Sequence, residues 1–342
     1  MPALALVTPY DFANWPVMGE IMLCWILRLD YTRIGNASSG RIVSGCGGHL
    51  PIPMGTPSMR QLATCFLFVA FFAPRAEGQS VSSAKIELTD ALHFHAPFDG
   101  NANATVSTGQ GLIMTADSLE RKILVPGIQR RDVSVARGEG RFGDCLRFTG
   151  RANEVICFAG TEMHYADKDW SGSVSLWMRL DPDKDLLPGY CDPLQITQHA
   201  WNNGAFFVDF DKELPRDFRL GVFSDLKHWN PKDIPWEQWP VEKRPMVTVK
   251  NPPFSRSDWT HVVFTFDNVN SSSESPSVAS LFVNGTLQGV IRQPLVYKWD
   301  LSKVAIMLGI EYIGDLDDLM IFRRAITAEE VTFLYQSPAS LQ

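Results

Sequence analysis

Apolar and polar side chains alternate along several short stretches of the chain from residue 91 onward. In residues 92–96, LHFHA, apolar side chains alternate with His93 and His95. Residues 173–180 show the same alternation, and residues 259–267 are rich in β-branched and aromatic side chains. A period of two places every second side chain on one face, so each stretch is predicted to be a β-strand with a buried face.

Turn signals separate these predicted strands. The clearest lies in residues 278–290, where Asn284-Gly285 stands between two strand-like runs. This dipeptide suits a two-residue type I′ turn, because both central positions of that turn require a positive φ. Residues 195–210 and 217–223 add further predicted strands.

The chain closes with a predicted strand followed by a helix. An apolar run in residues 316–322 starts beside acidic residues, after a turn at Gly314. Thr327 and Glu330 have the spacing of a capping box, and the apolar residues of 331–335 then fall at helical spacing. Many short strands and one short C-terminal helix predict an all-β fold, an antiparallel jelly-roll β-sandwich.

The closing segment, residues 312–336, resembles the end of laminin G-like domains in the concanavalin A-like lectin/glucanase superfamily. The Phe-Asp-Gly-Asn turn at residues 98–101 is similar to the way these domains begin. The glycine-rich approach to a hairpin in residues 138–158 matches a second landmark of the family. The resemblance supports one domain over residues 91–337. It implies a concanavalin A-like sandwich that binds carbohydrate or a cell-surface protein.

The overall charge of the chain bears on its partners. The 342 residues include 31 basic and 38 acidic side chains, which gives a net charge of −7. Binding to nucleic acid or to an anionic membrane surface calls for a clustered basic face. We therefore expect neither a nucleic-acid partner nor a basic membrane-binding surface.

Residues 59–78 have the three parts of a secretory signal peptide. Arg60 precedes an apolar run in residues 62–73, and small residues follow it. The run is too short for a permanent transmembrane helix, so no membrane span is expected once it is removed. Residues 1–58 are then either a mis-called start or a disordered extension, and the polar residues 79–90 are predicted to be a linker.

A cleaved signal peptide implies that the chain is exported, to the periplasm, the cell surface or the medium. Export permits disulfides. Cys145 and Cys157 lie on two predicted strands around a short turn, where they either form a disulfide or remain small buried thiols. Cys191 has no evident partner.

Acidic residues occur at both ends of the predicted domain. Asp317 lies on the closing strand and Asp99 in the opening turn. Related sandwiches often hold a structural calcium ion that fixes the first strand to the last. The resemblance therefore implies one structural Ca²⁺ bound by Asp99 and Asp317, with carbonyl groups of Gly100 and Asn101 as further hard oxygen ligands. The alternative is that these are ordinary solvated turns.

Residues 226–254 form a long segment rich in tryptophan and proline. Trp229, Trp236 and Trp239 could stack on sugar rings, with His228 among the nearby hydrogen-bonding groups. The alternative is that these tryptophans fix the long loop to the sandwich, because an irregular loop of this length needs a small core of its own.

The sequence lacks the usual motifs of hydrolysis. No E-x-D-x-x-E run provides the paired carboxylates of the superfamily's glucanases, and no G-x-S-x-G is present. We therefore expect a non-catalytic binding module. A polysaccharide hydrolase or lyase and a purely structural envelope domain are the alternatives.

Overall fold

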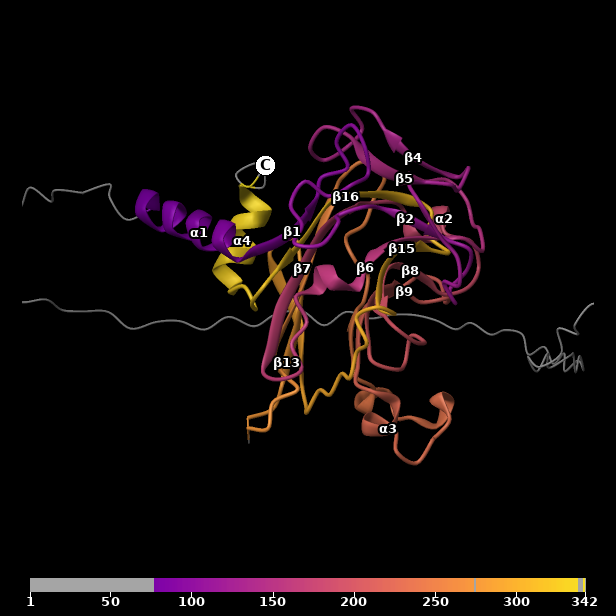
Figure 1. Cartoon of the computed structure of the whole chain (residues 1–342), viewed down its shortest axis with the longest axis vertical. Coiled ribbons are helices and arrows are strands. Elements are labelled where there is room, and N and C mark those ends of the chain that lie inside the picture. The colour runs from indigo at the N-terminus through magenta and orange to yellow at the C-terminus, as the bar shows by residue number, and fades with distance from the viewer. Residues whose placement is uncertain (1–76, 274, 338–340, 342) are drawn as a thin grey trace, which may run out of the picture. The chain divides into compact units, whose positions relative to one another are not determined.

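A computed structural model of the chain describes residues 77–273, 275–337 and 341. These residues form two antiparallel eight-stranded β-sheets, shown in Figure 1. The predicted all-β sandwich is thereby confirmed. The predicted signal peptide and the residues before it lie outside this part, apart from Glu77 and Gly78. Within the described ranges, no helix has the length and apolar character needed to cross a membrane.

We name the two layers sheet A and sheet B. The strand order in sheet A is β14 (Thr286–Arg292), β13 (Val278–Val283), β12 (Thr260–Val269), β7 (Trp170–Arg179), β16 (Gly314–Phe322), β5 (Cys145–Phe148) and β4 (Val133–Ala136), and β1 (Leu92–Ala96) pairs with β16. The order in sheet B is β11 (Met246–Val249), β10 (Phe218–Phe223), β9 (Ala205–Phe210), β8 (Cys191–Thr197), β15 (Ala305–Ile310), β6 (Val155–Ala159), β2 (Met114–Ala116) and β3 (Leu124–Pro126).

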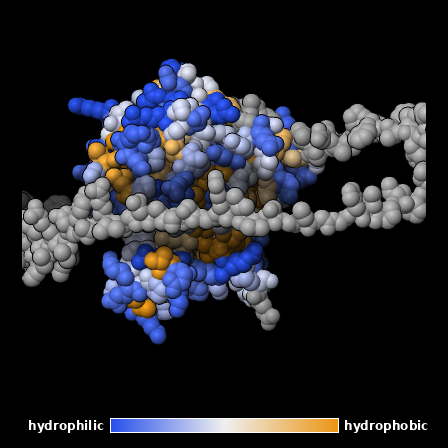
Figure 2. All heavy atoms as spheres, turned by 180° about the vertical axis from the view of Figure 1, so that it is seen from behind, coloured by the Kyte–Doolittle hydropathy of each residue, from blue (hydrophilic) through white to orange (hydrophobic). Residues whose placement is uncertain are grey.

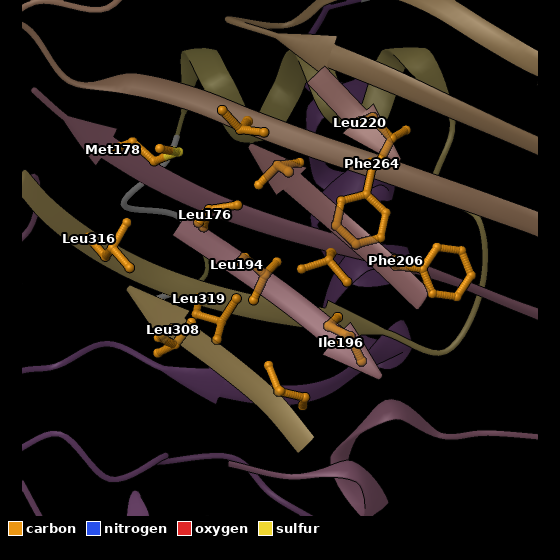
Figure 3. Packing of buried hydrophobic residues seen from close by; sticks show 14 of the residues in the cluster. Leu176, Met178, Leu194, Ile196, Phe206, Leu220, Phe264, Leu308, Leu316 and Leu319 are labelled. Carbon is orange, nitrogen blue, oxygen red and sulfur yellow. The ribbon is translucent and has the colours of Figure 1, made fainter. Parts of the chain in front are cut away.

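The inward faces of both sheets meet in one hydrophobic core. Figure 3 shows side chains of the two sheets in contact, with Leu176 of β7 and Phe264 of β12 from sheet A and Leu194 of β8 and Phe206 of β9 from sheet B. Burying one such side chain contributes about 1.5–3 kcal/mol, so this layer is the main source of stability. The alternation of apolar and polar residues along each strand determines which side chains face this core.

Two helices cover the outer face of sheet A. The helix α1 (Glu77–Ala91) contacts α4 (Ala328–Gln336), and Figure 1 shows them side by side. Leu88 of α1 packs in a second apolar cluster with Val263 and Phe282 of the sheet. The expected linker over residues 79–90 is therefore wrong, since this segment is helical and contributes a fully buried leucine.

The predicted capping box is present at the start of α4. The Thr327 side chain accepts a hydrogen bond from the Glu330 N–H, and the Glu330 carboxylate accepts one from the Thr327 N–H. The Asn284-Gly285 hairpin is also confirmed, because it joins β13 to β14 and both residues have a positive φ, 49° and 76°.

Cys145 and Cys157 do not form a disulfide. Cys145 lies on β5 of sheet A and Cys157 on β6 of sheet B, and both are buried free thiols, as is Cys191. The chain crosses from one sheet to the other between them, so the hairpin that would bring them together is absent. The second alternative, buried thiols in the core, is the correct one.

Short helical turns occupy several connections between the strands. They are η1 (Gly160–Met163), α2 (Pro182–Asp185), α3 (Leu226–Trp229), η2 (Trp236–Gln238) and η3 (Val241–Lys243). The last three lie in the Trp/Pro-rich loop between β10 and β11, with α3 at the bottom of Figure 1. Residues 226–245 thus connect neighbouring strands of sheet B, and the strand β11 lies within the segment 226–254.

Candidate functional site

The strand β16 changes its partner midway along its length. Its first residues pair with β5, and its last residues pair with β1, while β7 lies on the other side. The pairing with β7 is irregular between Asp317 and Met320, and Asp318 has a positive φ of 56°. Asp317 and Asp318 therefore lie at the junction where β16 changes its partner from β5 to β1.

Asp317 is fully buried at this junction. Its Oδ2 atom accepts a hydrogen bond from the Phe142 N–H over 3.0 Å, and its Oδ1 atom has no partner among the described residues. Burial, followed by the nearby Asp318 carboxylate, raises the pKa of Asp317 to about 8. A buried carboxyl with an unsatisfied oxygen needs either a proton or a cation.

A glycine-rich loop, residues 138–144, connects Asp99 with Asp317. Asp99 Oδ1 accepts a hydrogen bond from the Asp144 N–H over 2.7 Å. Gly143, with a φ of 62°, lies so close that a Cβ there would overlap the Asp99 carboxylate. The Asp144 carboxylate accepts hydrogen bonds from the N–H groups of Gly100 and Gly138. The glycines thus allow the loop to approach the opening turn closely.

The structure brings Asp99 and Asp317 into one neighbourhood, since the Asp99 charge also raises the pKa of Asp317. Asp318 has a partner in His95, whose Nε2 lies 2.6 Å from Asp318 Oδ1. Within the described part of the chain, no group of three or more acidic, histidine or cysteine side chains converges as a metal site. A cation here would need backbone carbonyls or water as additional ligands.

The three predicted tryptophans of the loop lie together against sheet B. Phe223 of β10 points outward, away from the core, because its neighbour Val222 is in the core. The Trp229 ring meets Phe223 edge-on at 5.1 Å, and Trp239 lies 5.2 Å from Trp229. Trp229 Nε1 also donates to the backbone oxygen of Asn202 over 2.8 Å. These contacts fix the loop to the outer face of the sheet.

Trp201 is an aromatic residue that sequence reasoning missed. It lies in the turn after β8, is 37% exposed, and meets the Trp236 ring edge-to-face at 5.2 Å and 82°. It also meets Phe223 at 5.4 Å. We call Trp201, Trp229, Trp236 and Trp239 the aromatic patch. The rings of the aromatic patch are tilted against one another, so they form no single flat platform. The predicted ligand residue His228 is exposed on the nearby helix α3.

Arg244 covers part of the aromatic patch. Its guanidinium lies 4.1 Å from the centre of the Trp236 ring, a cation–π contact that helps to hold the loop. In Figure 2 the loop that carries α3 is at the lower left, where hydrophobic residues are surrounded by hydrophilic ones.

A large aromatic side chain directly before the Asn202-Asn203-Gly204 turn was the only signal for Trp201 in the sequence.

A polar row crosses the same face of sheet B. Arg219 of β10 pairs with Asp209 of β9 through both carboxylate oxygens, with its Nε 2.9 Å from Asp209 Oδ1. The Arg219 guanidinium lies 5.0 Å from the Tyr190 ring. A bulge in the pairing of β8 with β9 places Asp192 near Asp209. Because these residues lie on three strands, their spacing in the sequence gives no motif.

The pKa values of both carboxyl groups in this row, Asp192 and Asp209, are raised. Burial, followed by the nearby Asp209 charge, raises the pKa of Asp192 well above its ordinary value. Burial also raises the pKa of Asp209, although its ion pair with Arg219 opposes this. The outer face of sheet B therefore carries aromatic rings beside a largely buried ion pair.

Comparison with known proteins identifies a family. Residues 162–332 match a laminin G family model of the concanavalin A-like lectin/glucanases superfamily. Comparison with curated proteins gives no match.

Three solved structures are similar to this chain. Domain 4 of the extracellular GH43 arabinanase AbnA from Geobacillus stearothermophilus, in complex with arabinotriose, is 16% identical; the match covers 72% of this chain and 98% of that chain, with a TM-score of 0.44. The binding domain of Paraclostridial Mosquitocidal Protein 1 is 13% identical, with coverages of 73% and 53% and a TM-score of 0.45. The botulinum neurotoxin serotype D binding domain is 13% identical, with coverages of 75% and 53% and a TM-score of 0.47. The chain thus spans about half the length of the last two.

Proposed function

Because the chain belongs to the concanavalin A-like lectin/glucanase superfamily, we propose that it is an exported, non-catalytic module that binds carbohydrate. The partner is a free glycan or the glycan of a cell-surface protein. The observation that carries this proposal is the exposed Trp201 ring, which lies edge-to-face with Trp236 on the outer face of sheet B.

Sugar rings suit this surface for a physical reason. The C–H face of a pyranose stacks on an indole ring, and its hydroxyl groups need hydrogen-bonding partners nearby. Trp201 offers an exposed ring, which Trp236 and Phe223 hold in place. Arg219 and Asp209 lie on the same face, but they are paired with each other and largely covered, so the sugar hydroxyls would have to find other partners. His228 on α3 is a further candidate for contact with a sugar hydroxyl.

We also propose that one Ca²⁺ binds at the junction on β16. The unpartnered Oδ1 of Asp317 fits a hard cation, and the close approach of Asp99 to the loop of residues 138–144 places a second carboxylate nearby. Carbonyl groups of Gly100 and Asn101 are the expected further ligands. Such an ion would neutralise the buried carboxylate and fix the opening turn to the closing strand.

A hydrolase is the second candidate function, and one observation favours it. Asp192 and Asp209 are neighbouring carboxyl groups, and the pKa of Asp192 is raised by burial and by the Asp209 charge. A carboxylic acid that stays protonated beside an ionised carboxylate is the pairing that glycoside hydrolysis requires. The ion pair between Asp209 and Arg219 opposes this role, because it neutralises the group that would act as base or nucleophile.

One experiment separates these functions. The full chain is titrated with a panel of polysaccharides while tryptophan fluorescence and the release of reducing ends are recorded. A binding module gives a saturable fluorescence change without new reducing ends, and Trp201→Ala weakens this binding at least tenfold. Tyr335→Ala is the matched control, because Tyr335 is 36% exposed but lies on α4, over sheet A.

Other results would contradict the proposal. Binding that Trp201→Ala leaves unchanged would place the glycan elsewhere. New reducing ends that disappear in Asp192→Asn would identify a hydrolase. Absence of any fluorescence change or new reducing ends across the panel would favour the structural alternative over carbohydrate binding.

A further inference from the structure

An open cleft lies beside the start of β7, between the segment that precedes β7 and the segment that precedes β15. Its volume is about 620 Å³, within the range of about 300–1,000 Å³ that is usual for ligand sites. The residues that line it include Tyr165, Asp167, Val296, Lys298 and Asp300. Asp317 pairs with Trp177 near the other end of β7, so the cleft is separate from the proposed calcium site.

Hydrogen bonds fix the two walls of the cleft to each other. The Tyr165 hydroxyl donates to the Tyr297 carbonyl over 2.8 Å. The Asn270 amide donates to the Ala166 carbonyl over 3.1 Å and accepts from the Tyr297 N–H over 2.7 Å. The cleft is therefore formed before a ligand binds, as is usual for ligand sites.

The cleft combines an aromatic ring with polar groups that have no partner. The Tyr165 ring is partly exposed and packs against Trp170 at 5.1 Å and Trp299 at 5.7 Å. Asp167 and Lys298 are exposed, and neither side chain has a hydrogen bond or an ion pair within the described part of the chain. A carboxylate accepts hydrogen bonds and an ammonium group donates them. The two groups can thus bond sugar hydroxyls in both directions while the ring stacks on a C–H face.

The charges of the cleft favour a neutral ligand. The Asp300 carboxylate already accepts a hydrogen bond from the Ser302 hydroxyl and forms an ion pair with Lys303. One free carboxylate, of Asp167, and one free ammonium group, of Lys298, remain among the residues named above. A ligand with a net charge would be attracted by one and repelled by the other, whereas a neutral sugar chain uses both.

Only a short turn separates the cleft from the aromatic patch. Trp299, which lines the cleft, donates from Nε1 to the Gly204 carbonyl at the end of this turn over 2.7 Å. Trp229 of the aromatic patch donates to the Asn202 carbonyl at its start. Trp201 directly precedes the turn. Its exposed ring and the cleft are therefore held by the same short segment.

On the basis of the carbohydrate binding proposed for Trp201, we propose that this cleft is a second subsite for the same glycan. One part of the chain stacks on Trp201, and a later part crosses the turn and enters the cleft. There a sugar ring stacks on Tyr165, and Asp167 and Lys298 bond its hydroxyl groups. The cleft supplies the hydrogen-bonding partners that the covered ion pair of sheet B does not. The ligand is therefore a neutral chain of several sugar residues, since a single sugar occupies only one of the two subsites.

The dependence of affinity on chain length tests this proposal. The polysaccharide of the panel that gives the largest fluorescence change is cut into oligosaccharides of one to six residues, and their affinities for the full chain are measured by calorimetry. The affinity should rise at least tenfold from the disaccharide to the hexasaccharide, because the second contact becomes intramolecular once the first has formed. High salt should not weaken binding, since a neutral ligand makes no ion pair that salt could screen.

Variants at the cleft test which residues form the second subsite. Asp167→Ala and Lys298→Ala should each weaken hexasaccharide binding at least fivefold and remove most of its advantage over the disaccharide. Lys168→Ala is the matched control, because Lys168 is also exposed and is next to Asp167 but does not line the cleft; it should leave binding unchanged. These positions are exposed, so the melting temperatures of the variants should equal that of the unmodified chain.

Three results would overturn the second subsite. If Trp201→Ala weakens binding and neither cleft variant does, or if the disaccharide binds as tightly as the hexasaccharide, carbohydrate binding at Trp201 stands and the second subsite is wrong. If the cleft variants weaken binding and Trp201→Ala does not, the glycan binds in the cleft alone, and the two subsites are not linked. If no polysaccharide of the panel binds, the proposed function and the second subsite both fail.

Discussion

The Phe142 N–H donates a hydrogen bond of 3.0 Å to Asp317 Oδ2. This bond joins the glycine-rich loop of residues 138–144 to the closing strand β16, and it leaves Asp317 Oδ1 without a partner among the described residues. The same loop also holds Asp99 through the Asp144 N–H. The beginning, middle and end of the domain therefore meet at one buried carboxylate.

Removal of calcium should lower the stability of the domain. A ligand that binds only the folded state at about 100 times its Kd adds about 2.7 kcal/mol. We expect the melting temperature of the full chain to fall when a chelator replaces calcium. Asp317→Asn should abolish this difference, and Glu242→Gln, at an exposed position of the Trp/Pro-rich loop, should retain it. A melting temperature that calcium does not change would exclude this site as a stabilising one.

Substitution of Gly143 should impair the same site. Gly143→Ala places a Cβ against the Asp99 carboxylate, whereas Gly138→Ala meets no atom within 4 Å. Both glycines have a positive φ, 62° and 66°, so both variants carry a similar backbone penalty of about 1 kcal/mol. Calcium titration should therefore show weaker binding for Gly143→Ala than for Gly138→Ala. Equal affinities would show that the position of Asp99 does not matter for the ion.

Acid should destabilise the domain through His261. This residue is buried and stacks on Trp177 at 4.5 Å; Ser175 Oγ lies 2.8 Å from its Nε2, and its Nδ1 has no partner in the described structure. Burial, followed by the charge of Arg141, lowers the pKa of His261 to about 3. Tyr335 of α4 stacks near the same ring.

The sign of this effect follows from the difference between the folded and unfolded states. Between pH 6.5 and about 3, the unfolded chain binds a proton at His261 that the folded chain does not. The free energy of unfolding should therefore fall by up to about 1.4 kcal/mol for each pH unit below 6.5. Denaturant unfolding from pH 7 to 4.5 measures this slope. His261→Gln should reduce it, and an unchanged slope would assign the acid sensitivity to other groups.

Loss of the capping box should destabilise α4. Thr327→Ala removes the acceptor for the Glu330 N–H, and such changes cost about 0.5–2 kcal/mol. Thr332→Ala, within the same helix, removes a hydroxyl that bonds the Ala328 carbonyl and no capping group. Denaturant unfolding should show a larger loss for Thr327→Ala. If the two variants lose equal stability, the cap is not what fixes the helix.

Local chemistry made several elements predictable. Asn284-Gly285 requires a tight hairpin because both residues tolerate a positive φ, and Thr327 with Glu330 starts a helix because each satisfies an unpaired backbone group of the first turn. Both signals act within a few residues. By contrast, the helix α1 was not predicted. Its stability depends on the packing of Leu88 with residues of α4 and sheet A. The mostly polar sequence of this segment gives no sign of that packing.

The sequence by itself determined the sandwich fold, since a period of two in hydrophobicity decides which side chains are buried. Only the tertiary structure decided which strands are neighbours. It separated Cys145 from Cys157, joined Asp192 to Asp209 and Arg219, and placed Trp201 against Trp236. The physical reason is that a strand's own residues specify its buried face, whereas its partner is selected by packing and hydrogen bonding between segments that are distant along the chain.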